Sequence, residues 1–168
     1  MRIGCLRALR AGVGDTPRRC YLGEARMADD VKDMMQRLYD AVNGGNLDLM
    51  DELLAEDFTE HEEFPGFSPD RDGVKKFFGM ARAAFDGFRM DVEDLVVDGD
   101  RVAVRATLHG THTGEFLEIP ATGKTVAVPL ADFGRINGDG KLAEHWGVMD
   151  NLVLMQQLGL APEEPPAG

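Results

Sequence analysis

A single carboxylate, that of Asp132, lies in a sequence pattern that suits proton transfer. The segment 125–136 alternates with period two, and its other even-numbered residues are Val, Leu, Gly or Ile. Because alternate residues of a strand face the same side, Asp132 is expected on an otherwise apolar face. A carboxylate withdrawn from water is a candidate general base or acid near neutral pH. The alternatives are an exposed edge position and an ion pair with Arg105 or Arg135.

The phrase EHWGVMD, residues 144–150, holds further side chains that can do chemistry. His145 is a candidate for holding a base or for donating to a developing oxyanion, and Asp150 is a candidate second acid. Trp146 is a candidate wall of a pocket. On a strand, His145 and Trp146 face opposite sides unless a bulge intervenes. The alternatives are a core tryptophan and a hydrogen-bonded structural histidine.

The segment DFTEHEEFPGF, residues 57–67, crowds four acids around His61. A histidine beside carboxylates is a candidate for proton transfer near neutral pH. If the chain is an enzyme, we expect His61 and Asp132 to converge on one cavity. The alternative is a solvated acidic loop.

Two patterns that resemble known sites fail on spacing. The phrase TGKT, residues 122–125, lacks the first glycine of a phosphate-binding loop and lies between predicted strands. His109 and His112 are three positions apart on a predicted strand, so they face opposite sides and cannot share a metal. Cys5 and Cys20 both precede the predicted folded part, which excludes thiolate sites from it. We therefore expect no metal site in the folded part.

Charge excludes two classes of partner. The 168 residues carry a formal net charge of −12 at pH 7, which repels phosphate backbones and anionic lipids. We therefore expect no nucleic acid and no membrane as partners. Residues 1–26 are rich in arginine and lack the apolar block of a secretory signal. They are expected to form a disordered extension, or translation begins at Met27. A cytoplasmic location fits the cysteine-free remainder.

The elements that must position these residues follow from the apolar spacing. A period near 3.6 predicts three helices, the last ended by Gly87, and a period of two predicts four antiparallel strands after it. A short helix and a flexible tail, residues 161–168, complete the chain. Helices followed by strands indicate one α+β domain over residues 27–160. The predicted helices span 28–45, 47–57, 69–85 and 150–158, and the predicted strands span 90–97, 101–116, 121–136 and 141–149.

Three phrases, in this order, give the chain a resemblance to a known family. They are LYDAVNGGNLDLMDELLAEDFTEHEEFPG, GTHTGEFLEIPATGKTV and the ending DGK, EHW, D, QQLG. Over about residues 30–160 the chain resembles the SnoaL-like polyketide cyclases of the nuclear-transport-factor-2-like superfamily. The resemblance implies a cone-shaped, curved antiparallel sheet with about three N-terminal helices on its concave face and a short C-terminal helix. It also implies a deep apolar pocket and a homo-oligomer, either a dimer or a tetramer.

The activity that the resemblance implies is cofactor-independent proton abstraction and intramolecular aldol cyclisation, or related isomerase or hydrolase chemistry. The substrate would be a small apolar or polyketide-like molecule. Asp132 would be the base or acid, with His61 or His145 holding it and Asp150 as a second acid. The expected pocket walls are Trp146, Tyr39, Phe58 and Phe78.

One position departs from the family pattern. Relatives often carry an acid directly after the tryptophan, where this chain has Gly147. The departure favours an alternative function for the same fold, a non-catalytic hydrophobic-ligand-binding or dimerisation module.

Overall fold

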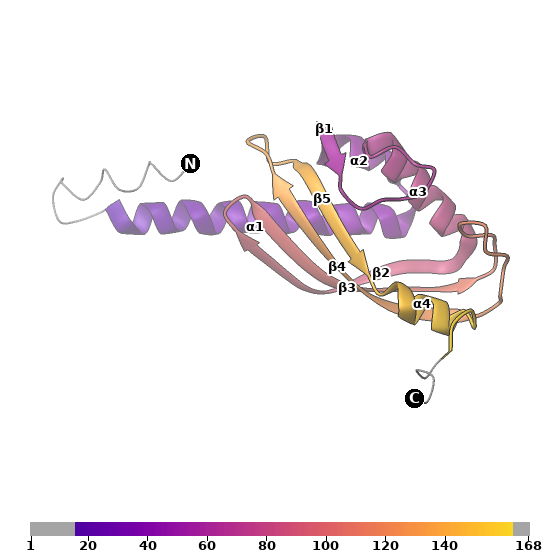
Figure 1. Ribbon diagram of the computed structural model, residues 1–168. Helices are drawn as coiled ribbons and strands as arrows, with labels where there is room; N and C mark the ends of the chain where they lie inside the picture. The colour runs from indigo at the N-terminus through magenta and orange to yellow at the C-terminus, as the bar shows by residue number, and fades with distance from the viewer. Residues whose placement is uncertain (1–15, 163–168) are drawn as a thin grey trace.

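The computed structural model describes residues 16–162 of the protein, and the side chains from Arg26 onward. One strand lies among the N-terminal helices, four strands follow these helices, and a short helix ends the described part (Figure 1). The expected α+β class is confirmed. The elements are α1 (Thr16–Gly44), the 3₁₀ turn η2 (Leu47–Leu49), α2 (Met50–Leu53), β1 (Leu54–Glu60), α3 (Arg71–Ala84), β2 (Phe85–Asp98), β3 (Arg101–His112), β4 (Thr125–Ile136), β5 (Leu142–Met149) and α4 (Asn151–Gln157).

The sheet is curved and unclosed, with the strand order β1-β5-β4-β3-β2. Strands β2 to β5 form the antiparallel meander predicted from the period-two patterns and their turns. Strand β1 differs, because it pairs parallel with β5 at the far edge. The sheet is therefore mixed, and the expectation of a purely antiparallel sheet is corrected at this edge.

The predicted second helix, residues 47–57, is wrong over its second half. Helical structure ends at Leu53, and the chain continues as strand β1 from Leu54 to Glu60. Leu54 and Phe58 are buried there. The strand gains its hydrogen bonds from β5, which lies about 85 residues further along the chain. Such a distant partner overrides the local helical spacing, which carries no information about it.

Helix α1 begins at Thr16, inside the segment 1–26 that was expected to be a disordered extension. Residues 16–26 are thus continuous with the helix that packs on the sheet. Residues 1–15 and 163–168, which include most of the predicted tail, lie outside the described part of the chain.

The prediction that Gly87 ends the third helix is wrong. Helix α3 ends at Ala84, and Phe85 already belongs to β2. Gly87 lies within that strand at a φ of 67°, where the register with β3 shifts between Asp86 and Arg89. A bulge of this kind uses the positive φ that glycine tolerates, and it bends the strand.

The core lies between the helices and one face of the sheet. In β4 the even-numbered residues from 126 to 130 are buried and their odd-numbered neighbours are exposed, as the alternation predicted. Helices α1 and α3 cover this face with apolar stripes. The main contributors are Val31, Met35, Leu38 and Val42 from α1, Val74, Phe77 and Ala81 from α3, and Val102, Val104, Val126 and Val128 from the sheet.

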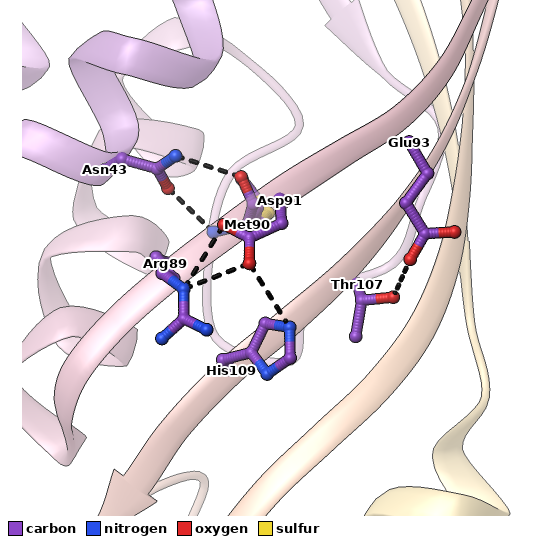
Figure 2. Close-up of polar contacts among 7 residues, drawn as sticks. All are labelled: Asn43, Arg89, Met90, Asp91, Glu93, Thr107 and His109. Atoms are coloured by element: carbon purple, nitrogen blue, oxygen red, sulfur yellow. Dashed lines mark hydrogen bonds and ion pairs between the residues drawn. The ribbon is translucent and has the colours of Figure 1, made fainter.

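The C-terminal end of α1 is joined to β2 through one side chain. The Asn43 amide donates to the Met90 carbonyl at 2.9 Å and accepts from the Met90 N–H at 2.7 Å. Figure 2 shows these two bonds, and beside them the ion pairs of Asp91 with Arg89 and His109. Asn43 therefore sets the position of α1, and of the pocket residues that α1 carries, against the sheet.

We expect Asn43→Ala to lower the free energy of unfolding by about 2–3 kcal/mol, because two hydrogen bonds are lost and the Met90 backbone groups are left unpaired. Urea unfolding measures this change. Gln36→Ala, which removes an exposed hydrogen bond to Asp40 on the same helix, should change it by less than about 0.5 kcal/mol. Equal effects of the two substitutions would contradict the anchoring role of Asn43.

Candidate active site

An apolar pocket lies between α1, α3 and the covered face of the sheet. Tyr39, Phe58 and Phe78 line it. Further walls come from Met35, Leu38, Val42, Phe77, Phe88, Leu108, Phe116, Leu130 and Leu154. The ionisable side chains that line it come from β1, the loop after β1, β4 and β5, and they are Glu60, Glu62, Asp132 and His145.

Asp132 faces this pocket from β4, and its side chain is 16% exposed. One carboxylate oxygen accepts a hydrogen bond from the Tyr39 hydroxyl on α1. The other lies 3.3 Å from Nε2 of His145 on β5. Two neighbouring elements therefore hold the carboxylate in one orientation.

The basic partners considered for Asp132 lie elsewhere. Arg105 pairs with Glu93 and Asp94 on the neighbouring strand. Arg135 pairs with Glu144. The carboxylate of Asp132 therefore contacts Tyr39 and His145 and faces the pocket.

His145 lies between two carboxylates. Its Nδ1 is 2.7 Å and 2.9 Å from the two oxygens of Glu60, whose side chain is only 2% exposed. This contact follows from the parallel pairing of β1 with β5, in which Glu60 and His145 are register partners. Glu60, His145, Asp132 and Tyr39 therefore form one continuous chain of polar contacts across four elements.

The protonation states of His145 and Tyr39 follow from their contacts. Burial by itself lowers the pKa of His145, but the hydrogen bonds and charges of Asp132 and Glu60 outweigh it and raise the pKa to about 10. The imidazole is therefore a cation at neutral pH that donates from both ring nitrogens. Burial and the charge of Asp132 raise the pKa of Tyr39, so its hydroxyl keeps its proton and donates it.

His61 does not converge with Asp132. Its Nε2 lies 3.1 Å from Glu144, and its ring stacks on Trp146 with centroids 4.4 Å apart and planes 3° apart. Neither His61 nor Trp146 lines the pocket. As the alternation predicted, His145 faces inward and Trp146 faces the opposite side of the sheet.

Asp150 is a helix cap and does not line the pocket. Its side chain accepts a hydrogen bond from the Val153 N–H at 3.0 Å, which begins α4. An aspartate at this position satisfies one of the free N–H groups of the first turn.

Sequence patterns alone did not identify Glu60 and Glu62 as candidate site residues, because they are only two of the four acids around His61. One signal for them is present, because alternate residues of an extended segment face the same side. If β1 is a strand, Glu60 and Glu62 face inward together, while His61 faces outward. Burial, together with the charges of Glu60 and Asp132, raises the pKa of Glu62 to about 7, although His145 opposes the shift.

A family model of SnoaL-like polyketide cyclases matches residues 32–158 of the chain. The chain belongs to the SnoaL-like polyketide cyclase family. A comparison with curated protein sequences gives no match.

Solved structures of several similar proteins share the fold. TsrD from Streptomyces laurentii is 30% identical, with a TM-score of 0.73 over 79% of this chain and 97% of that one. IdmH from Streptomyces antibioticus, a candidate polyketide cyclase, is 34% identical, with a TM-score of 0.67 over 77% and 98%. AclR from Streptomyces galilaeus, a candidate hydroxylase, is 28% identical, with a TM-score of 0.72 over 83% and 91%.

Among the side chains described, from Arg26 to Pro162, no three of His, Cys, Asp or Glu are grouped so that they could hold a metal ion. In the same part of the chain, no helix combines the length and the apolar character needed to cross a membrane.

We expect Glu62→Gln to make the protein more stable at high pH but not at low pH. The carboxyl titrates near 4.5 in the unfolded chain and near 7 in the folded one, so folding favours the protonated form. The free energy of unfolding of the parent protein should therefore fall, relative to the variant, as the pH rises from about 4.5 to about 7. After allowance for partial solvent exposure, the difference should reach about 1–2 kcal/mol.

Urea unfolding at about pH 4 and pH 8 measures this difference. Glu63→Gln is the matched control, because Glu63 is the exposed neighbour of Glu62. A constant difference between Glu62→Gln and the parent across this range would contradict the assigned titration.

Proposed function

We propose that the protein catalyses cofactor-independent proton abstraction next to a carbonyl, followed by intramolecular aldol closure of a small apolar or polyketide-like molecule. The observation that carries the proposal is the Asp132 carboxylate, which faces an apolar pocket while Tyr39 and His145 hold it from two sides. Membership of the SnoaL-like family supports the substrate class.

Asp132 is the proposed base. Each carboxylate oxygen has two lone-pair directions, so one hydrogen bond to each oxygen leaves a direction free for a substrate proton. Tyr39 and His145 restrict the carboxylate to one orientation, which favours a reactive geometry over a mobile one. Glu60 is a positioning residue, because it fixes the ring of His145 from behind and keeps its charge.

His145 also supplies the positive charge that an enolate needs. Removal of a proton next to a carbonyl leaves negative charge on oxygen, and a fixed cation in a water-poor pocket lowers the energy of that state. The substrate's own carbonyls delocalise the rest of the charge. Apolar walls such as Phe58 and Phe78 exclude water and strengthen these electrostatic interactions.

A second function is favoured by the walls themselves, which are overwhelmingly apolar. The pocket would then hold a hydrophobic ligand without chemistry. The two proposals differ in whether a bound carbonyl compound loses a proton to Asp132, so one experiment separates them.

A homo-oligomer is also part of the proposal. Strands β4 and β5 carry exposed apolar side chains, Phe133 at 49% and Val148 at 64%, and Phe133 is the cross-strand partner of Trp146. Exposed apolar residues that gather on one face are typical of protein–protein contacts.

We expect the parent protein to accelerate the exchange of deuterium into a linear triketone in which one methylene lies between two carbonyls. Asp132→Asn should lower this acceleration about 100-fold or more, since the amide cannot take the proton. Proton NMR in D₂O measures the rate. Asp57→Asn is the matched control, because Asp57 is an exposed residue of β1, and it should behave as the parent protein.

Binding of the triketone without any acceleration of exchange would support the ligand-binding module and reject the enzyme. Acceleration that survives Asp132→Asn would leave the pocket catalytic but remove Asp132 as the base.

A further inference from the structure

On the pocket-facing side of β5, Gly147 has no side chain where other residues would project one. Gly147 is the cross-strand partner of Asp132, so its missing side chain would point into the pocket beside that carboxylate. A Cβ atom built on Gly147 would overlap Oε2 of Glu62 and lie 3.0 Å from its Cδ. The carboxylate of Glu62 therefore occupies the space that any other residue at position 147 would fill.

The backbone around Glu62 is attached to the same part of the sheet. The His61 N–H donates to the His145 carbonyl at 2.8 Å. The Glu62 N–H donates to Oε1 of Glu60 at 2.9 Å. These two bonds aim the Glu62 side chain across β5 towards Gly147. Between Arg26 and Pro162, nothing hydrogen-bonds the Glu62 carboxylate, so it remains available to a molecule in the pocket.

The two acids lie close enough to act on one molecule. Directly opposed residues of an antiparallel pair have Cβ positions about 4.5–5.5 Å apart. The Glu62 carboxylate lies at the Cβ position of residue 147, and Asp132 projects from the opposite residue. Two carboxyl groups thus face the same end of the pocket, one from β4 and one from the loop after β1.

We propose that Glu62 is the acid that protonates the alkoxide formed on ring closure, and that Gly147 is required because it admits the Glu62 carboxylate to the pocket. This inference rests on the proposed function. It assigns to a loop glutamate the second proton transfer of the same reaction.

The two transfers balance. Asp132 takes a proton from the carbon next to a carbonyl, and the resulting enolate carbon forms a C–C bond with the second carbonyl carbon. The π pair of that carbonyl moves to its oxygen, which takes the proton of Glu62. The product is an isomer of the substrate. Asp132 is left protonated and Glu62 ionised, and exchange with water restores both.

The environment of Glu62 suits a proton donor. Its charge is disfavoured by burial and by the nearby carboxylates of Glu60 and Asp132, while His145 partly offsets them. The pKa of about 7 leaves a substantial protonated fraction at neutral pH. Asp132, by contrast, is held by the cationic His145 and by Tyr39, so the two carboxyl groups have different environments.

The first test separates the two proton transfers in one substrate, a linear triketone whose activated methylene can close a six-membered ring on its third carbonyl. We expect Glu62→Gln to keep the rate of deuterium exchange at that methylene within about 3-fold and to lower the rate of ring closure about 100-fold. The fall in closure rate above about pH 7 should also disappear. Glu63→Gln, a substitution of the exposed neighbour, should change neither rate.

The second test uses the geometry of residue 147. The backbone there is not left-handed, so Gly147→Ala is conformationally allowed, and its methyl group should displace the Glu62 carboxylate. Ring closure should fall as in Glu62→Gln, and the double variant should be no slower than either single one. Gly138→Ala is the matched control, because a Cβ there meets nothing within 4 Å.

The third test returns a carboxylate to the same space from the other strand. In a Glu62→Ala background, Gly147→Asp should restore ring closure at least about 10-fold, since the new side chain projects into the vacated space. A general loss of folding cannot produce such a recovery.

Failure of the inference differs from failure of the proposed function. If exchange requires Asp132 but ring closure is indifferent to Glu62→Gln, or Gly147→Asp restores nothing, Glu62 is not the acid and the function stands. If the parent protein accelerates neither exchange nor closure, the proposed function fails and the inference fails with it.

Discussion

The cationic ring of His145, held between the carboxylates of Glu60 and Asp132, is the interaction on which the pocket depends. It joins β1, β5 and β4, and Tyr39 extends it to α1. A buried charge is tolerated only when its partners are complete, because an unpaired ion in a poorly solvated site is expensive. The same contacts that place the proposed base therefore also fix the edge of the sheet against its centre and against the long helix.

Charge balance at this end of the pocket explains the state of the fourth ionisable group. The ring of His145 offsets part of the negative charge of Glu60 and Asp132, and a further carboxylate, that of Glu62, adds to the excess. The fold relieves this excess by favouring the protonated form of Glu62. The three carboxyl groups of the pocket are thereby divided, because Glu60 and Asp132 contact the His145 cation while Glu62 readily keeps its proton, and acid–base chemistry requires such a division.

The edge strand β1 determines which side chains of the acidic segment after α2 face the pocket. Because β1 pairs parallel with β5, Glu60 faces His145 on the pocket side. His61 turns to the other side, where it stacks on Trp146 and contacts Glu144. Position 147 then decides how far Glu62 can enter, since only glycine leaves room for its carboxylate. The arrangement of acids in the pocket thus depends on the pairing of β1 with β5 and on the absence of a side chain at position 147.

Local sequence patterns determined the meander, the helical stripes of α1 and α3, the inward position of Asp132 and the opposite orientations of His145 and Trp146. Each of these follows from a period of 2 or 3.6, which is a property of neighbouring residues. Tertiary structure alone decided that Leu54–Glu60 is a strand, that His61 lies outside the pocket, and that Glu60 and Glu62 lie inside it. These outcomes depend on the pairing of β1 with β5, about 85 positions away. A residue's own neighbours cannot encode such a partner, because the hydrogen bonds and the space it provides exist only once the chain has folded.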